Sequence, residues 1–319
     1  MASLLIIGGS GFFGKSILDA YGRGKLKSWG IDSLILLARN AEALKVTNPE
    51  LLANALVTLV NEDIATCKTL PQADYVIHAA ASADAAAYLS KPLSERENIL
   101  AGTRNFCNLA RLELRNSKIL YVSSGAAYGQ QPEGLDFITE DYDPGPVEEL
   151  SIGKRDYAAA KRDSEQLIYL LGRDGLDVSI ARCFAFIGKY LPRHTHFAIG
   201  NFLENGLRRC DIEVKETTPV FRSYMYADDL VSWLMTIIAS SNYSCPTYNV
   251  GSDEPIEVRD LAAMIASIYK VGTVCSPLIS SKADRYVPSI TLASSVLGLK
   301  LEFNLIEAIR ETRNRIECV

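Results

Sequence analysis

The sequence predicts an α/β fold, in which a doubly wound parallel sheet is followed by a smaller C-terminal α/β lobe. Short apolar runs alternate with segments of helical length through residues 1–185, and such alternation indicates parallel strands joined by crossover helices. A glycine-rich turn, Gly8–Gly14, directly follows the first apolar run. After residue 185 the elements become shorter and more irregular. We therefore expect residues 186–319 to form a second lobe, with some segments returning to the sheet.

Six apolar runs in the first part are short and bounded by polar or turn residues, as buried strands are. They are Leu4–Ile7, Ser33–Ala38, Leu56–Val60, Tyr75–Ala79, Ile119–Val122 and Val178–Arg182. Helices are expected at Gly14–Tyr21, Ser94–Arg115 and Tyr157–Arg173. In the second part we expect a strand at Thr247–Val250, helices at Val258–Tyr269 and Asn304–Arg315, and irregular stretches such as Lys189–Gly200 and Cys210–Ser223.

The composition restricts the class of protein. The chain has 319 residues, of which 48% are hydrophobic, so it can bury a large core. A net charge of -5 argues against nucleic acid or an anionic membrane surface as the main partner. No stretch approaches the roughly 20 apolar residues of a membrane span, and the N-terminal run is too short for a signal sequence. We expect a cytoplasmic protein.

Cysteine and histidine usage argues against a metal site. The seven cysteines are scattered without a CxxC pair, and the chain has only three histidines. This pattern is typical of reduced thiols in an intracellular protein. His194 and His196 lie close together but have no carboxylate or cysteine nearby, so we expect no metal there.

Three glycines spaced three residues apart predict a phosphate-binding turn. Gly8, Gly11 and Gly14 follow a predicted strand and open a predicted helix. A tight turn and a close backbone approach let a pyrophosphate sit on the free N–H groups of the helix N-terminus. The context therefore indicates a Rossmann-type dinucleotide-binding domain at residues 1–185.

The end of the second strand indicates which dinucleotide binds. NAD-binding domains usually place an acidic residue there for the ribose 2′-hydroxyl, whereas this chain has Ala38 and Arg39. A guanidinium suits a 2′-phosphate, so we expect NADP(H) in preference to NAD(H). The alternative for Arg39 is a solvated loop position. Asp63, next to Ile64, is interpreted either as an adenine contact or as a plain turn residue.

Ordered motifs over nearly the whole chain resemble the extended short-chain dehydrogenase/reductases, the NAD(P)-dependent epimerase/dehydratase family acting on nucleotide sugars. They are Gly8–Gly14, His78–Ala81, Asn98 with Gly102-Thr103, Tyr121–Gly129, Tyr157–Lys161, Arg222–Leu230 and Tyr248–Gly251. Together with the strand ends, the resemblance implies cofactor contacts at Gly8, Gly11, Phe12, Phe13, Gly14, Arg39, Asp63, Ile64, Ala79, Ala80, Ala81, Asn98, Tyr157 and Lys161.

Tyr157 and Lys161 lie one helical turn apart and so share a helix face. A free tyrosine is a poor base at neutral pH, but a nearby ammonium and the positive charge of an oxidised nicotinamide favour its phenolate. Tyr157 is thus the expected general acid/base. The family spacing implies that Ser124 donates a hydrogen bond to the same substrate oxygen, with Ser123 as the weaker candidate.

The resemblance implies a nucleoside diphosphate sugar as substrate, bound by the lobe at residues 186–319. Arg222 and Arg285 match arginines that grip phosphate oxygens, and Asn201 falls where a contact to the base is usual. Where the family commonly has an asparagine after the sixth strand, this chain has Ala185. Lys189 or Arg193 is the expected replacement, with a solvated loop as the alternative.

The residues after Ser124 narrow the expected reaction. Family dehydratases carry an acid and a base there, whereas this chain has Gly125 and Ala126, so dehydration and decarboxylation are not expected. Reduction of a 4-keto (6-deoxy) hexose by NADPH is favoured, with 4-epimerisation by a retained NAD(P) as the alternative and non-catalytic NADP(H) binding third. The resemblance also implies a homodimer formed by Ser94–Arg115 and Tyr157–Arg173, and a role in polysaccharide precursor synthesis.

Overall fold

The computed structural model describes residues 2–53, 56–81, 90–193 and 197–317. The chain divides into two compact units. The first contains Met1–Ala127, Pro146–Cys183 and Val231–Tyr248, and the second contains Tyr128–Gly145, Phe184–Leu230 and Asn249–Val319. The assignment of cofactor and substrate to separate lobes stays a prediction.

Seven strands form the main sheet, in the order β11-β6-β5-β4-β1-β2-β3. Their bounds are β1 Ala2–Ile7, β2 Ile31–Ala38, β3 Val57–Asn61, β4 Tyr75–His78, β5 Lys118–Ser124, β6 Asp177–Cys183 and β11 Thr247–Val250. The pairings from β3 through β6 are all parallel. The strand order reverses between β1 and β4, which is where open α/β sheets of this type bind their ligands. The predicted doubly wound α/β fold is confirmed.

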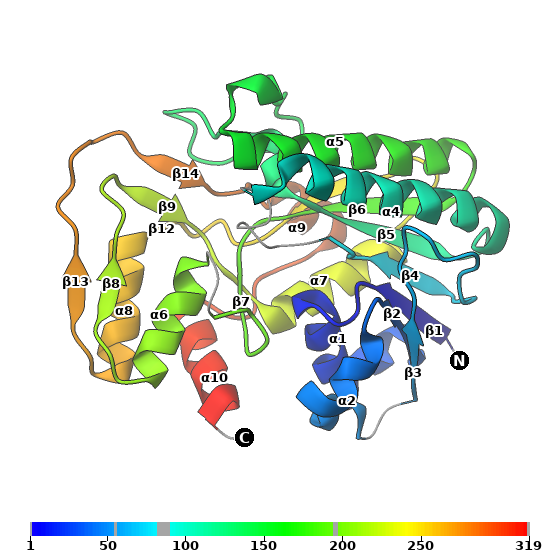
Figure 1. Ribbon diagram of the computed structural model, residues 1–319, viewed down its shortest axis with the longest axis horizontal. Coiled ribbons are helices and arrows are strands. Elements are labelled where there is room, and N and C mark those ends of the chain that lie inside the picture. Colours follow the sequence, from blue (N-terminus) through cyan, green and yellow to red (C-terminus); the bar gives the residue numbers. More distant parts are fainter. Residues whose placement is uncertain (1, 54–55, 82–89, 194–196, 318–319) are drawn as a thin grey trace. The chain divides into compact units, whose positions relative to one another are not determined.

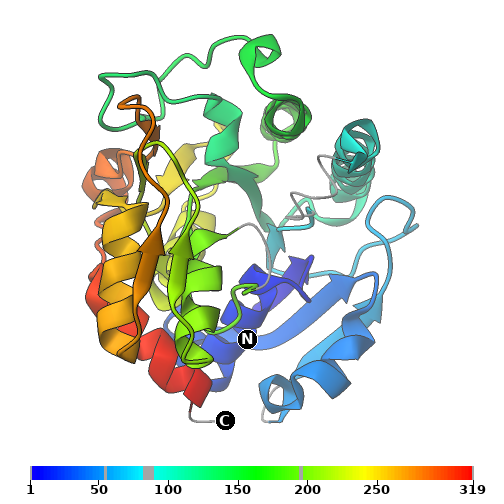
Figure 2. The same cartoon turned by 60° about the vertical axis from the view of Figure 1, so that its left-hand side comes forward.

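Helices cover both faces of this sheet. Their bounds in the first unit are α1 Phe12–Gly22, α2 Leu44–Thr47, α4 Pro92–Glu113 and α5 Ile152–Arg173. The long helices α4 and α5 lie side by side on one face (Figure 1), and α1 and α2 lie on the other (Figure 2). Buried apolar side chains from the strands and from α4 and α5 form one core, which includes Leu5, Ile7, Val76, Phe106, Ile119 and Leu171.

The second unit is built from small sheets and helices. Parallel β10 pairs with β7, β12-β9-β14 form a three-stranded sheet, and β13 pairs with β8. The strands are β7 Phe186–Ile187, β8 Ile212–Val214, β9 Val220–Arg222, β10 Met225–Tyr226, β12 Ile256–Glu257, β13 Thr273–Cys275 and β14 Asp284–Tyr286. The helices are α6 Ala198–Leu207, α8 Val258–Tyr269, α9 Thr291–Leu297 and α10 Leu305–Glu317, and α7 Ala227–Ala239 begins in this unit.

Most element predictions hold, and the misses have physical causes. All six early strands are present within two residues of their expected bounds, and β11 and α8 agree at both ends. The stretch Cys210–Ser223 was wrongly expected to be irregular: it contains β8 and β9, which at three residues each are too short for a periodic signal. Helix α5 begins at Ile152 rather than at Tyr157. Neither α6, which begins within the stretch Lys189–Gly200 expected to be irregular, nor α7 was predicted.

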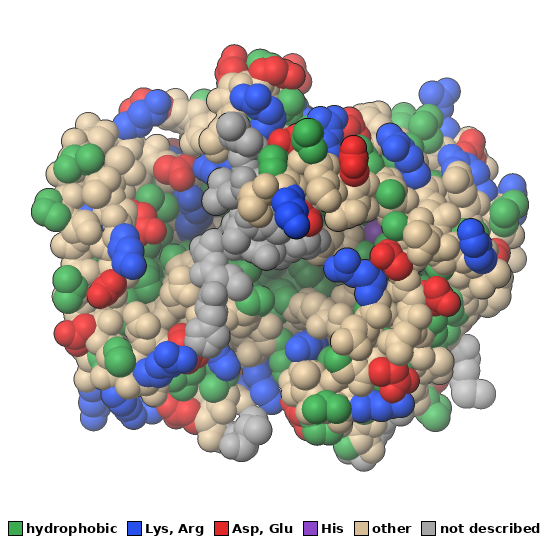
Figure 3. Space-filling model, in the orientation of Figure 1, with side chains coloured by type: hydrophobic (Ala, Val, Ile, Leu, Met, Phe, Trp, Pro, Cys, Tyr) green, Lys and Arg blue, Asp and Glu red, His purple; other side chains and the backbone are tan. Residues whose placement is uncertain are grey.

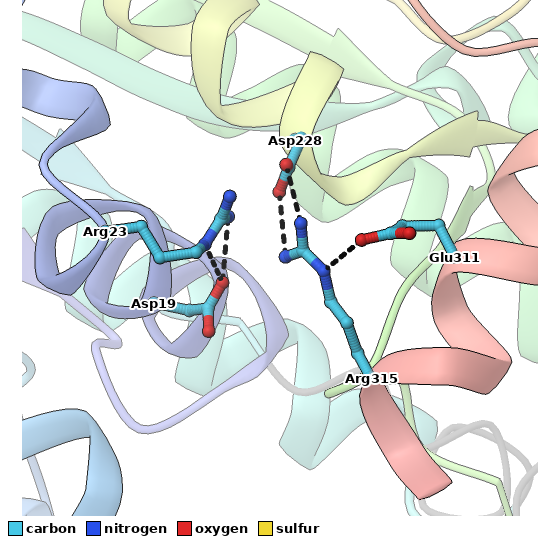
Figure 4. A network of polar contacts seen from close by, with 5 residues as sticks. All are labelled: Asp19, Arg23, Asp228, Glu311 and Arg315. Carbon is cyan, nitrogen blue, oxygen red and sulfur yellow. Dashed lines mark hydrogen bonds and ion pairs between the residues drawn. The ribbon is translucent and has the colours of Figure 1, made fainter. Parts of the chain in front are cut away.

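The start of α7 is held by two buried aspartates. Asp228 pairs with Arg315 of α10 at 3.0 Å, and Arg315 also reaches Glu311 of α10 at 2.9 Å (Figure 4). Asp229 accepts the backbone N–H groups of Glu302 (3.1 Å) and Phe303 (3.2 Å). The segment before α10 is therefore tied to the first turn of α7 by carboxylates.

Most apolar side chains of helices α4 and α5 are buried within the first unit. Of the apolar residues on these helices, Ile99, Phe106, Leu109 and Leu171 are buried, and Leu170 is 45% exposed. Contacts between the two helices include Arg96–Asp163 at 3.1 Å and Arg111–Asp174 at 2.7 Å. The homodimer stays a prediction.

Two glycines of α1 provide a matched test of the turn. A Cβ on Gly14 would lie 2.1 Å from the Gly9 carbonyl oxygen, whereas a Cβ on Gly22 meets nothing within 4 Å. We expect Gly14→Ala to lower the free energy of unfolding by about 2 kcal/mol or more. Gly22→Ala should stay within about 0.5 kcal/mol of wild type or be more stable. Urea unfolding measures both, and equal losses would contradict the close approach.

The raised pKa of Asp229 should make the stability of the protein depend on pH. Burial, opposed by its two backbone hydrogen bonds, raises the pKa of Asp229 to about 6. The folded chain then binds a proton as the pH falls through about 6, while the unfolded chain does so only near the ordinary pKa of about 3.9. Wild type should therefore gain up to about 1 kcal/mol over Asp229→Asn between pH 7 and pH 5. Urea unfolding of both at each pH tests this, and a constant difference would refute it.

Candidate active site

The turn between β1 and α1 is shaped by close backbone contacts that only glycine allows. Gly8 has φ +88°, and a Cβ there would lie 2.8 Å from the backbone of Ala79. Gly14 is pressed against the turn at Gly9. Gly11 is the N-cap of α1 and has no side chain to cap the helix. The helix N-terminus is thus left to backbone N–H groups, which fits the expected pyrophosphate.

The end of β4 lies beside this turn. Ala79 donates its N–H to the carbonyl oxygen of Ile7 at 2.8 Å, and Ala80 donates its N–H to Nδ1 of His78 at 3.3 Å. Burial, aided by the charge of Lys161, lowers the pKa of His78 to about 3. His78 is therefore a neutral structural residue and not an acid or base. Ala81, the next predicted contact, is exposed.

Arg39 follows β2 as predicted and is exposed. Within the described part of the chain, no carboxylate pairs with its guanidinium, which leaves it available to an anion. The Asp63 carboxylate accepts the Ala65 N–H at 2.9 Å, so the turn interpretation of Asp63 fits the structure. Ile64 packs against Gly102 of α4, where a Cβ would lie 3.1 Å from it.

The remaining predicted cofactor contacts flank the turn or lie on α4. Phe12 and Phe13 open α1, with their ring centroids 5.7 Å apart. Asn98 is exposed on α4, immediately before Ile99, the first buried residue of the helix. Their contacts to a dinucleotide stay predictions.

Tyr157 and Lys161 share one face of α5, and Lys161 is fixed against β5. The Lys161 ammonium donates to the carbonyl oxygen of Val122 at 2.9 Å and lies 3.5 Å from the Tyr121 hydroxyl. It also lies 5.0 Å from the Tyr121 ring centroid and 5.8 Å from that of Tyr157. Lys161 is only 3% exposed. Its charge is thus held beside the tyrosine at the carboxyl end of β5.

The two adjacent serines differ in their partners. Ser123 is buried and donates its hydroxyl to Glu165 at 2.5 Å. Ser124 is half-buried, and its hydroxyl oxygen accepts the Ala126 N–H at 3.1 Å. No acceptor for the Ser124 hydroxyl proton lies among the described residues. The geometry therefore favours Ser124 over Ser123 as a donor to a substrate oxygen.

The two arginines expected to grip phosphate lie in the second unit but face different ways. Register pairs Arg222 with Tyr286 and Arg285 with Phe221, and neighbouring strand residues alternate between faces. The Arg222 guanidinium binds Asp284 at 2.8 Å, whereas that of Arg285 lies 4.7 Å from the Phe221 ring centroid. The structure therefore does not bring these arginines together on one face of the sheet.

The other predicted substrate residues are placed as follows. Asn201 is half-buried on α6. Arg193 pairs with Glu204 of α6 at 3.2 Å, and the Lys189 ammonium lies 5.2 Å from the Tyr190 ring centroid. These contacts do not distinguish Lys189 from Arg193 as the replacement for the asparagine that the family commonly has at the position of Ala185. The pair His194 and His196 lies outside the described residues.

In the structure, three residues that were not predicted from the sequence contact predicted site residues. Glu165 binds Ser123, Tyr121 contacts Lys161, and Asp284 binds Arg222. Glu165 follows Lys161 by four positions, so the helical spacing carried a signal for it. Asp284 had none, because its position depends on the pairing of β14 with β9.

Across residues 2–53, 56–81, 90–193 and 197–317, no group of three or more histidine, cysteine or acidic side chains is arranged to hold a metal. No helix in these ranges has the length and apolar character needed to span a bilayer. On the face drawn in Figure 3, acidic and basic side chains are interspersed.

The first unit thus combines a glycine turn suited to a dinucleotide with a tyrosine and a lysine on one helix. This combination defines the class of protein, a nicotinamide dinucleotide-dependent enzyme. The chain belongs to the NAD-dependent epimerase/dehydratase family, whose model matches residues 4–251.

Curated relatives cover most of the chain at low identity. UDP-glucuronic acid decarboxylase 1 of Danio rerio is 25% identical over 97% of this chain and 71% of its own length. GDP-6-deoxy-D-mannose reductase of Pseudomonas aeruginosa is 27% identical over 62% of this chain and 64% of its own length. These two relatives are thus named for different reactions, a decarboxylation and a reduction.

Solved structures agree in fold. UDP-glucose 4-epimerase from Thermotoga maritima, with UDP-glucose, has a TM-score of 0.81 at 22% identity, and the match covers 99% of both chains. The enzyme of that name from Thermus thermophilus, in complex with NAD, has a TM-score of 0.79 at 22% identity with the same coverage.

Proposed function

We propose that this chain is an NADP(H)-dependent oxidoreductase of nucleoside diphosphate sugars, and that it reduces a 4-keto (6-deoxy) hexose. The observation that carries the proposal is the placement of Tyr157 and Lys161 on one face of α5, with the buried Lys161 ammonium held against β5, in the unit that holds the glycine turn. Similarity to the reductase and to the UDP-sugar enzymes supports the substrate class.

The residues present fit a nicotinamide dinucleotide, since Gly8, Gly11 and Gly14 leave the α1 N-terminus open to a pyrophosphate. When bound, the dinucleotide supplies hydride to the sugar carbon. Tyr157 then donates its hydroxyl proton to the oxygen on that carbon. Ser124 donates a hydrogen bond to the same oxygen, and the ammonium of Lys161 favours the phenolate that remains on Tyr157.

The residues after Ser124 separate reduction from dehydration. Gly125 is buried and Ala126 is half-buried in the short helical turn after β5, and neither side chain can move a proton. The elimination of water needs such groups in addition to Tyr157. A reaction that needs only hydride transfer and one acid therefore fits this site best.

The second candidate is a 4-epimerase that retains its NAD(P). It is favoured by the similarity in fold to the two UDP-glucose 4-epimerases, one of which is in complex with NAD. Both reactions use Tyr157, Ser124 and Lys161, but in an epimerase Tyr157 would act first as a base and then as an acid. They differ in whether the reduced dinucleotide is consumed.

The diphosphate is proposed to bind at Arg222. Its guanidinium is fixed by Asp284 (2.8 Å) and packs 5.9 Å from the Tyr286 ring centroid. The planar guanidinium of Arg222 presents a fork of donors that suits a phosphate oxygen. The Asp284 carboxylate orients this guanidinium, but its negative charge also repels the diphosphate. Arg285, on the opposite face of the small sheet, is proposed only as a separate contact.

Arg39 provides a test of cofactor choice that needs no substrate. We expect NADPH to bind at least about tenfold more tightly than NADH, because a guanidinium hydrogen bond to a 2′-phosphate is worth about 1.5–3 kcal/mol. Arg39→Gln should remove that preference and leave NADH binding unchanged. Fluorescence titration measures both affinities. Arg115→Gln, another exposed arginine, is the control and should change neither, and equal affinities in wild type would contradict the proposal.

The reaction itself is tested with nucleoside diphosphate 4-keto-6-deoxyhexoses, by following the absorbance of NADPH and of NADH. Stoichiometric loss of NADPH with one sugar is the expected result. Tyr157→Phe should reduce the rate by about 10²–10⁴-fold while dinucleotide affinity stays the same. Undiminished turnover by this variant would overturn the mechanism. Interconversion of UDP-sugars without net consumption would instead identify the epimerase.

A further inference from the structure

A buried carboxylate on α5, Glu165, is not part of the proposed chemistry. Its side chain is 8% exposed and that of Arg182 is 18% exposed. Arg182 donates to both carboxylate oxygens, with Nη2 2.7 Å from Oε2 and Nε 3.1 Å from Oε1. Ser123 donates its hydroxyl to Oε1 at 2.5 Å. Protein donors therefore surround Glu165, and its charge is balanced by one arginine.

The position of Glu165 relates it to the candidate catalytic pair. Tyr157, Lys161 and Glu165 are spaced four residues apart and so lie on one face of α5. Lys161 donates to the carbonyl oxygen of Val122, and Glu165 accepts from the side chain of Ser123. Successive turns of α5 are thus attached to successive residues of β5, so the helix can neither slide along the strand nor rotate about its own axis without losing one of these contacts.

Strand β6 supplies the third partner. Ser123 and Arg182 are register neighbours in the pairing of β5 with β6, so the donors from two adjacent strands converge on one carboxylate. Ser124 is the next residue of β5. A shift of Ser123 would move Ser124 with it, since the two share a peptide bond.

We propose that Glu165, held by Ser123 and Arg182, is a positioning residue that fixes α5 on β5 and thereby sets where Tyr157 and Lys161 lie relative to Ser124. Glu165 does not touch the substrate oxygen. The inference rests on the proposed function only in that Tyr157, Lys161 and Ser124 are the reacting groups.

A second buried arginine–carboxylate pair gives a matched control. Asp228 and Arg315 have side-chain exposures of 6% and 22% and are 3.0 Å apart, which is close to the burial and distance of Glu165 with Arg182. That pair joins α7 to α10. Glu165→Gln and Asp228→Asn therefore make the same chemical change at similar burial, and only the first is expected to loosen α5.

The test is hydrogen–deuterium exchange of the ligand-free protein, read on peptides that cover Tyr157–Lys161. Ser123→Ala, which removes a single hydroxyl, and Glu165→Gln should each speed exchange in this turn by about tenfold, the loss expected from a hydrogen bond to a charged group. Asp228→Asn should leave the turn at the wild-type rate. Unchanged exchange in Ser123→Ala, or equal acceleration in all three variants, would overturn the proposal.

A kinetic readout separates this inference from the proposed function. With a substrate that wild type turns over, Ser123→Ala should lower kcat by about tenfold and leave KM unchanged, because no substrate contact is lost. A raised KM with unchanged kcat would refute the positioning role. If wild type turns over none of the sugars, the proposed function fails, and the exchange experiment still decides whether Glu165 fixes the helix.

Discussion

The attachment of α5 to the carboxyl end of β5 is the interaction on which the site depends. The Lys161 ammonium is buried and donates to the carbonyl oxygen of Val122. Burying an unpaired charge is costly, yet no acidic side chain in the described ranges pairs with Lys161. Neutral dipoles and the faces of two tyrosine rings hold it instead. A carboxylate partner would cancel the positive charge on which the proposed role of Tyr157 relies, so the neutral surroundings suit that role.

The dinucleotide turn depends on a different constraint, the absence of side chains. The glycines of the turn face different neighbours. Gly8 lies against the end of β4, and Gly14 lies against the backbone of Gly9. Gly8 meets the end of β4 because β1 and β4 are neighbours in the sheet. The sheet order thus brings β4 to the turn at the place where the strand order reverses, and the local contact between Gly14 and Gly9 keeps the turn tight. The expected cofactor site follows from the two together.

Whereas neutral groups hold Lys161 in the first unit, three arginines of the second unit are paired with carboxylates. Arg222 is paired with Asp284, Arg285 with Asp136, and Arg315 with Asp228. For Arg315, the pairing with Asp228 joins α7 to α10. The hydrogen bonds that the Arg315 guanidinium makes offset the cost of burying this ion pair. For Arg222, the carboxylate opposes the anion that the guanidinium is proposed to bind. The proposed diphosphate would therefore have to compete with Asp284 for the Arg222 guanidinium.

The sequence alone determined the features that are local along the chain. Short apolar runs predicted the strands of the main sheet, because burial on both faces leaves that pattern. Glycine spacing located the turn, and helical spacing put Tyr157 and Lys161 on one face. Only the tertiary structure decided what depends on residues far apart in sequence. The Ser123 hydroxyl donates to Glu165, whereas the Ser124 hydroxyl finds no acceptor among the described residues. Arg222 and Arg285 face opposite ways, and three-residue strands form in Cys210–Ser223. These follow from strand pairing and burial, and neither leaves a periodic trace in a short segment.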